Sequence, residues 1–81
     1  MVDLKSLGLD PAPTWELAAP GILRLSGTKY EIRYEADYHG LGPWFTYWHD
    51  KKQIGFDASI ESVKYSVRRH MEQLLQMGLE P

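Results

Sequence analysis

The chain has 81 residues, 43% of them hydrophobic and 25% charged, with a formal net charge of −2 and no cysteine. This length allows one domain and leaves little room for a deep, walled-off cavity. The lack of cysteine excludes disulfides, thiolate metal sites and cysteine nucleophiles, and it fits a cytoplasmic location. No apolar run approaches the roughly 20 residues that cross a bilayer, so no membrane partner is expected. A net charge this close to zero favours neither nucleic-acid binding nor mimicry of nucleic acid.

Two prolines and a glycine interrupt the beginning of the chain. Proline restricts its own backbone and disfavours helical geometry in the residue before it. We therefore expect residues 1–14 to form a partly ordered N-terminal arm and residues 15–81 to form a single domain.

Several stretches of the chain alternate between apolar and polar residues, as strands with one buried face do. The most regular begins at Tyr30, with Tyr30 and Ile32 on one face and Glu31 and Arg33 on the other. Strands are expected at residues 22–25, 30–36, 44–49 and 54–56, with an alternating stretch at 15–17 that can begin another. Two glycines and a proline predict a mobile loop at residues 38–43, and a turn is expected at residues 50–53.

A helix is expected to begin near Ser59 and to end near Gly78. The Ser59 hydroxyl can accept a hydrogen bond from a free amide of the first turn, and Gly78 can adopt the left-handed conformation that ends a helix. Apolar residues recur at helical spacing; they are Ile60, Val63, Val67, Met71 and Leu74, with Leu75 widening the stripe. The elements together predict an α+β fold, an antiparallel three- to four-stranded β-meander packed against one C-terminal α-helix.

The sequence carries no recognisable catalytic or metal-binding pattern. His39, His49 and His70 lack the short spacing of helical metal-binding motifs. Glu31 and Glu35 share a strand face, but at roughly 13 Å apart they are too distant for a glycosidase pair. Nucleophile elbows, phosphate loops and dinucleotide fingerprints are also absent. We therefore expect no enzymatic activity, no cofactor and no metal.

The strand expected at residues 44–49 carries rings on both faces, because Trp44 and Trp48 alternate with Tyr47 and His49. One helix covers only one face of a sheet. Either the N-terminal arm covers the second face, or aromatic side chains are exposed there and mark a binding surface. The predicted partner-binding patch consists of Trp44, Tyr47, Trp48 and His49, with Lys51 and Lys52 at its rim.

Basic residues of the helix form a secondary candidate surface, with Arg68 and Arg69 as its main members. The alternative function is nucleic-acid binding, through Lys51, Lys52, Lys64, Arg68 and Arg69. Glu61 and Glu72 lie at spacings that allow ion pairs with Lys64 and Arg68. Such pairs are typical of a solvent-exposed helix face rather than of a surface that binds the phosphates of a nucleic-acid backbone. Nucleic acid is therefore not the favoured partner.

The aromatic hairpin at residues 43–56, followed by a helix, resembles the integrase-arm type of DNA-binding domain. That resemblance implies a sheet that enters the major groove with basic and tryptophan side chains on its outer face. Here the face of the preceding strand departs from the pattern, because Glu31, Glu35 and Asp37 surround Arg33. Carboxylates at these positions repel phosphate.

The chain also resembles small orphan proteins of phages and mobile elements, through the pieces at residues 15–17, 30–32 and 44–56 and the helix from Ser59. Proteins of this kind include anti-CRISPR inhibitors, which occupy a surface of a host defence complex. The resemblance implies a non-enzymatic protein–protein binding module whose partner is a host protein or ribonucleoprotein complex. A homodimer formed through an exposed strand such as residues 22–25 is a further expectation to test.

Overall fold

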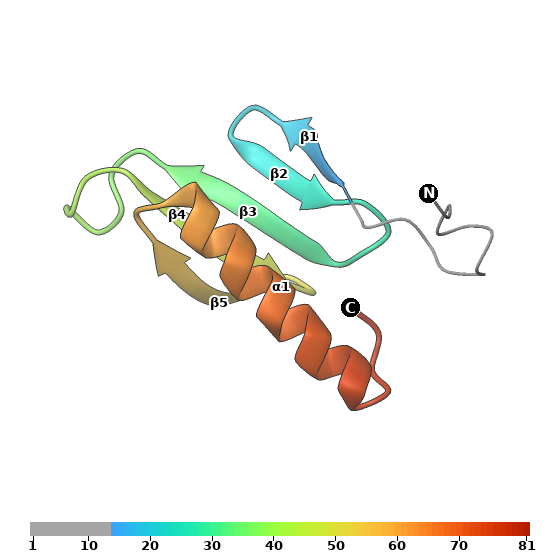
Figure 1. The fold of residues 1–81 in the computed structure, drawn as a ribbon. Coiled ribbons are helices and arrows are strands. Elements are labelled where there is room, and N and C mark those ends of the chain that lie inside the picture. The colour runs from blue at the N-terminus through green and yellow to red at the C-terminus, as the bar shows by residue number, and fades with distance from the viewer. Residues whose placement is uncertain (1–13) are drawn as a thin grey trace, which may run out of the picture.

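The computed structural model describes residues 14–81, so the arm expected at the start of the chain lies, except for Thr14, outside the described residues. Five strands form one antiparallel sheet in the order of the sequence, and a single helix follows them (Figure 1). The elements are β1 (Trp15–Ala19), β2 (Ile22–Leu25), β3 (Tyr30–Glu35), β4 (Trp44–His49), β5 (Lys52–Asp57) and α1 (Ile60–Gln76). The predicted α+β meander is confirmed in class and topology.

The predicted number of strands is wrong, because the sheet has five rather than three or four. The additional strand is β1, which pairs with β2 and places Glu16 opposite Arg24 and Leu17 opposite Leu23. Except for Trp15, the residues of β1 are exposed. A strand without a buried face does not require apolar and polar residues to alternate regularly, so the sequence of β1 predicts a strand only weakly.

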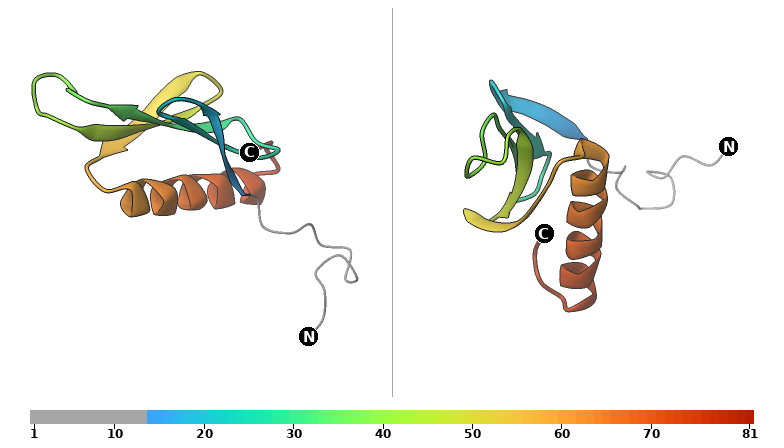
Figure 2. Two further views of the ribbon diagram at one scale, coloured as in Figure 1. Left: turned by 90° about the horizontal axis from the view of Figure 1, so that it is seen from above. Right: turned by 90° about the vertical axis from the view of Figure 1, so that its left-hand side faces the viewer.

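The helix packs against one face of the sheet, and no helix or strand of residues 14–81 forms a second layer on the other face (Figure 2). The core forms between α1 and the sheet, and its buried residues are Leu25, Tyr30, Ile32, Val63 and Val67. Ile60, Met71 and Leu74 pack against this core, which confirms the predicted stripe. Leu75 was expected to widen the stripe but is 55% exposed. It lies about 100° around the helix from Leu74, and that turn carries its side chain away from the sheet.

Both predicted ends of the helix are confirmed. The Ser59 hydroxyl accepts a hydrogen bond from the Ser62 amide at 3.4 Å. At the other end, Gly78 has a φ of 74°, and the Leu79 amide donates to the Leu74 carbonyl at 2.8 Å. This arrangement is a Schellman motif, which satisfies the last helical carbonyls and turns the chain back toward the sheet.

A β-bulge decides which side chains of β5 face the helix. The register between β4 and β5 shifts between Tyr47 and Trp48, and this leaves Ile54 of β5 as the extra residue. Ile54 packs against the core, whereas Phe56 lies opposite Thr46 on the other face of the sheet. Without the bulge, the period of two would place Ile54 and Phe56 on the same face.

The turn between β4 and β5 is tighter than the sequence predicted. Strand β5 begins at Lys52, which pairs directly with His49, so only Asp50 and Lys51 lie between the strands. Asp50 has a φ of 50° and Lys51 a φ of 67°. Two left-handed residues form the type I′ turn that matches the twist of a hairpin, and the second of them is usually glycine.

We expect the substitution Lys51→Gly to raise the free energy of unfolding by about 1 kcal/mol, because glycine has no Cβ to clash in the left-handed region. Urea denaturation at neutral pH measures this change. Lys52→Gly is the matched control, because Lys52 lies within β5 and glycine there should destabilise the strand. A loss of stability in both variants would contradict the strained-turn argument.

Candidate functional site

Trp44 and Trp48 of β4 lie on the face of the sheet that is turned away from α1, here called the outer face. They lie opposite Glu35 and Glu31 of β3, and opposite residues of an antiparallel pair share a face. Both tryptophans are partly buried. The structure thus brings together two members of the predicted patch.

The other two rings of that patch lie on the helix side of the sheet. Tyr47 lies opposite Ile32, and His49 lies opposite Tyr30. The side chains of Ile32 and Tyr30 are buried beneath α1. Tyr47 and His49 are therefore separated from the tryptophans by the thickness of the sheet and belong to the packing around the core.

Two aromatic residues that the sequence did not identify complete the cluster on the outer face. The Phe56 ring centroid lies 5.4 Å from that of Trp44 and 5.2 Å from that of Tyr38. Gln53 donates a hydrogen bond from Nε2 to the Tyr38 hydroxyl oxygen at 2.8 Å, which fixes Tyr38 against β5. Phe56 is 49% exposed, so half of its surface is accessible to a partner. Trp44, Trp48, Phe56 and Tyr38 are hereafter called the aromatic cluster.

Trp48 is held in place from two sides. Its indole Nε1 donates a hydrogen bond to the Thr46 hydroxyl at 2.8 Å, and the guanidinium of Arg33 lies 4.3 Å from the ring centroid. A cation–π contact of this kind contributes about 0.5–1 kcal/mol at an exposed site. Thr46 is only 1% exposed although it lies on the outer face, which means that the larger side chains around it cover it. The side chain of Trp48 is therefore ordered before any partner arrives.

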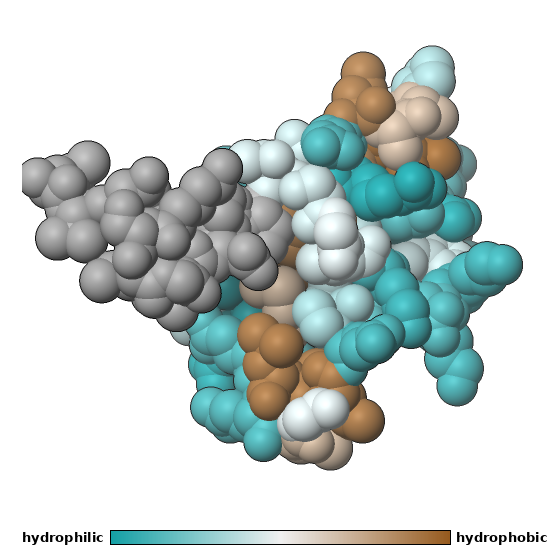
Figure 3. Space-filling view, turned by 90° about the vertical axis from the view of Figure 1, so that its right-hand side faces the viewer, coloured by the Kyte–Doolittle hydropathy of each residue, from teal (hydrophilic) through white to brown (hydrophobic). Residues whose placement is uncertain are grey.

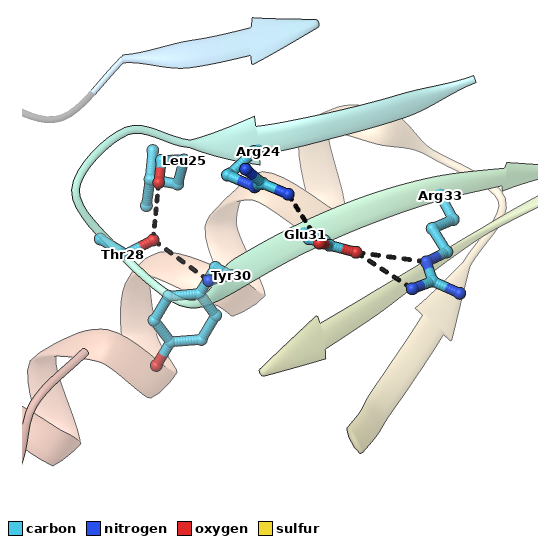
Figure 4. Close-up of polar contacts among 6 residues, drawn as sticks. All are labelled: Arg24, Leu25, Thr28, Tyr30, Glu31 and Arg33. Carbon is cyan, nitrogen blue, oxygen red and sulfur yellow. Dashed lines mark hydrogen bonds and ion pairs between the residues drawn. The ribbon is translucent and has the colours of Figure 1, made fainter. Parts of the chain in front are cut away.

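Opposite Trp48 in the sheet lies Glu31, whose carboxylate is shared by two arginines; Figure 4 shows the carboxylate with both arginines. Glu31 accepts from Arg24 at 3.4 Å through one oxygen and from Arg33 at 3.1 and 3.3 Å through the other. Exposed ion pairs contribute little to stability, typically about 0–1 kcal/mol. Their consequence here is geometric, because the pair with Glu31 positions Arg33 over the Trp48 ring. As predicted, Glu31 lies on the face of the sheet turned away from the core, and its carboxylate pairs with Arg24 and Arg33.

The loop at residues 38–43 supports the other end of the aromatic cluster. The Tyr38 amide donates to the Gly42 carbonyl at 2.8 Å, and the Leu41 amide donates to the Tyr38 carbonyl at 2.9 Å. The indole Nε1 of Trp44 donates to the Leu41 carbonyl at 3.3 Å. The segment expected as a mobile loop is thus closed by its own hydrogen bonds. Because both tryptophan N–H groups have partners within the chain, the cluster presents apolar ring surface rather than free donors.

The basic candidate residues do not join the aromatic cluster. Lys51 and Lys52 are exposed at the turn between β4 and β5. On α1, Arg68 binds Glu72 at 3.3 Å, which confirms the expected pair one helical turn apart. The Arg69 guanidinium lies 6.0 Å from the ring centroid of Tyr65. The structure therefore distributes the basic residues over a hairpin tip and a helix.

A groove of about 510 Å³ runs between α1 and the β1–β2 hairpin. Its apolar floor includes Trp15, Leu25, Val67 and Met71, and its rim is lined by Glu61, Lys64, Tyr65, Arg68 and Glu72. A separate apolar area lies at the C-terminal end of α1, at the bottom of Figure 3, and exposes Leu75, Met77 and Leu79.

The side chains of Tyr30, His49 and His70 meet between the sheet and the helix, whereas His39 is exposed. The Tyr30 hydroxyl and His70 Nδ1 are 2.6 Å apart. Burial raises the pKa of Tyr30 to about 12, so its hydroxyl stays protonated beside His70. His70, which was expected at the border of the apolar stripe, is thus a hydrogen-bond partner of the core. Across residues 14–81, no three His, Asp or Glu side chains gather as metal ligands.

Sequence reasoning missed Phe56, Tyr38 and Arg24 as members of the outer face. Tyr38 is held there by its hydrogen bond with Gln53, and Arg24 by its contact with Glu31. No local sequence pattern predicts either contact between separate elements. The position of Phe56 depends on the β-bulge, which alternation alone does not reveal.

No family model, curated protein or solved structure matches this chain. Within residues 14–81, no helix has the length and apolar character required to cross a membrane.

Proposed function

We propose that this protein is a non-enzymatic protein–protein binding module whose contact surface is the outer face of the sheet. The observation that carries the proposal is the aromatic cluster on the face that α1 leaves uncovered (Figure 2). No helix or strand of residues 14–81 lies over that face. Partly exposed rings gathered on one surface are typical of protein contact sites.

The composition and the order of the surface both support protein binding. Tryptophan, tyrosine and arginine dominate the binding energy of protein interfaces. Here Trp48 is fixed by Thr46 and Arg33, and Trp44 is fixed by the carbonyl of Leu41. A side chain that is already ordered loses less conformational entropy on binding, so more of its contact energy contributes to affinity.

The charges of the outer face favour a protein over a nucleic acid. Register places Glu16, Glu31 and Glu35 on this face together with Arg24 and Arg33, so the carboxylates outnumber the cations by one. A stacking platform for single-stranded nucleic acid needs a positively charged groove along the backbone. The lysines and arginines that would supply that charge lie on the hairpin tip and on α1.

A host defence complex, such as a CRISPR effector in the cytoplasm, is the first partner class to test. The resemblance to phage and mobile-element accessory proteins supports this choice. The titratable cluster of Tyr30, His49 and His70 supports a role without catalysis, because it lies in the interface between helix and sheet rather than in the groove.

We expect Trp44→Ala and Trp48→Ala each to weaken binding of the partner by about 30-fold, corresponding to about 2 kcal/mol, because buried tryptophans contribute most at interfaces. The measurement is isothermal titration calorimetry of the purified variants with purified candidate effector complexes. Circular dichroism and urea denaturation confirm that each variant is folded.

Tyr65→Ala is the matched control for these variants. Tyr65 is an aromatic residue of α1 that is 60% exposed and remote from the outer face. Its loss should leave affinity unchanged. If Tyr65→Ala weakens binding while both tryptophan variants bind normally, the contact surface lies on the helix and the proposal is wrong. Tight binding of single-stranded DNA or RNA that falls steeply with salt would identify the alternative function instead.

A further inference from the structure

Three rings from three elements meet where the second half of α1 crosses the sheet. They belong to Tyr30 of β3, His49 of β4 and His70 of α1. The ring centroids of Tyr30 and His49 are 4.5 Å apart, and the centroid of His70 lies 5.6 Å from each of them. Tyr30 is completely buried. The hydrogen bond between Tyr30 and His70 therefore joins the helix to the centre of the core.

His49 is the member of this group with an unsatisfied polar atom. Its Nε2 is buried and has no hydrogen-bond partner among residues 14–81. A neutral imidazole tolerates one unpaired acceptor nitrogen at modest cost, whereas an imidazolium has two N–H donors and a full charge to satisfy. The position therefore suits the neutral form of His49.

Other charged and polar groups face His49 from neighbouring elements. Lys29 comes from the turn between β2 and β3, Asp50 from the turn between β4 and β5, and the Pro81 carbonyl from the segment after α1. The Lys29 amide donates to the Pro81 carbonyl at 3.3 Å, which closes this end of the molecule. Asp50 and the Pro81 carbonyl favour a protonated ring, and Lys29 opposes it.

Burial and the neighbouring His70 outweigh these favourable contacts. Burial is the largest effect and His70 is the next, and together they lower the pKa of His49 below its usual value of 6.5. The tyrosine cannot compensate, because its hydroxyl is bound to His70 and stays protonated.

We propose that Tyr30, His49 and His70 form a pH-sensitive latch that holds the second half of α1 on the sheet while His49 is neutral and loosens it when His49 takes up a proton. A proton on His49 places a positive charge beside His70 and Lys29, in a ring whose Nε2 has no hydrogen-bond partner among residues 14–81. The helix residues next to the cluster, Met71 and Leu74, then lose their close packing on the sheet.

The direction of the pH effect follows from the lowered pKa of His49. Between the pKa of the folded state and that of the unfolded chain, the unfolded chain binds more protons, so acid favours unfolding. The contribution of His49 to stability is complete above about pH 6.5 and is lost as the pH falls through its folded-state pKa. Within that interval the folding equilibrium constant falls by up to about tenfold for each pH unit.

Urea denaturation between about pH 7.5 and pH 5 tests the latch in the wild type, His49→Phe and His39→Gln. His39 is the matched control, because it is an exposed histidine in the loop between β3 and β4. The wild type and His39→Gln should lose stability equally as the pH falls. For His49→Phe, the fall in the folding equilibrium constant over the same pH range should be several-fold smaller. Amide exchange in the wild type should accelerate at residues 70–77 before it does at residues 60–66.

An NMR titration of the wild-type imidazoles keeps the test decisive even if His49→Phe fails to fold. A titration midpoint for His49 below 6.5, together with faster exchange near the end of α1, supports the latch. A midpoint at or above 6.5 overturns it. An equal acid-induced loss of stability in the wild type and in His49→Phe also overturns it.

Discussion

Replacing Tyr30 with alanine will lower the free energy of unfolding by about 3–5 kcal/mol, the usual cost of removing a large ring from a core. Tyr30 is 0% exposed and contacts both His49 and His70. Its removal leaves a cavity and also removes the hydrogen-bond partner of His70 Nδ1. A small domain has only about 5–15 kcal/mol of stability, so this loss is a large share of the total and should lower the melting temperature markedly. Thermal denaturation followed by circular dichroism measures the effect.

Tyr30→Phe separates the two contributions, because phenylalanine keeps the ring and loses only the hydroxyl. We expect it to cost about 1–2 kcal/mol, since His70 Nδ1 is left without its hydrogen-bond partner. Tyr65→Ala controls for the loss of a tyrosine as such, because Tyr65 is 60% exposed and its removal should change stability by less than about 0.5 kcal/mol. A cost for Tyr30→Phe equal to that for Tyr30→Ala would show that the hydroxyl, and not the ring, stabilises the core.

Gly55→Ala is expected to cost about 1–3 kcal/mol, although alanine usually suits a strand better than glycine does. The reason is the ring of Tyr47, which crosses Gly55 from the neighbouring strand. A Cβ at position 55 would collide with the hydroxyl and Cζ of Tyr47 and would lie 2.7 Å from its Cε1. The ring would have to leave its place against the core. Urea denaturation of the variant measures the cost.

A double-mutant cycle with Tyr47→Ala isolates this contact. Once the ring is absent, the three atoms nearest to a Cβ at position 55 are gone, so Gly55→Ala should become neutral or stabilising in the Tyr47→Ala background. An unchanged cost in that background would mean that the backbone of β5, and not the tyrosine ring, excludes a side chain at this position.

The two faces of β4 have different consequences for the protein. Its helix side, with Tyr47 and His49, contributes to packing and to the pH dependence of stability. Its outer side, with Trp44 and Trp48, contributes little to the core and is the proposed contact surface. Variants on the outer side should therefore change binding more than stability, whereas variants on the helix side should do the reverse.

Local sequence patterns predicted the elements that are governed by local physics. The Ser59 cap, the Gly78 end and the apolar stripe depend on backbone geometry and on a period of 3.6 residues, and all three are confirmed. The alternation of Tyr30 and Ile32 with Glu31 and Arg33 also assigned the faces of β3 correctly. In each case the signal lies within a few residues of the feature that it predicts.

Local sequence patterns were not sufficient to predict which side chains form the proposed contact surface. Sequence reasoning assigned Trp44 and Trp48 to one face of this strand and Tyr47 and His49 to the other, but the predicted patch took rings from both faces because the covered face was not known. In a strand, neighbouring side chains point to opposite faces, so these four rings are divided between two surfaces. The packing of α1 decides which face of the sheet is covered. A strand that carries rings on both faces gives no indication of which face this is.

The sequence by itself determined the α+β class, the helix and its ends, and the regular strand β3, because each follows from propensities and spacings along a short stretch of chain. Only the tertiary structure decided that β1 pairs with β2 and that Phe56 joins the outer face. It also brought His49 and His70 together around Tyr30. The register of the strands, the bulge at Ile54 and the packing of α1 create these contacts, and they join residues far apart in the sequence whose local patterns carry no information about one another.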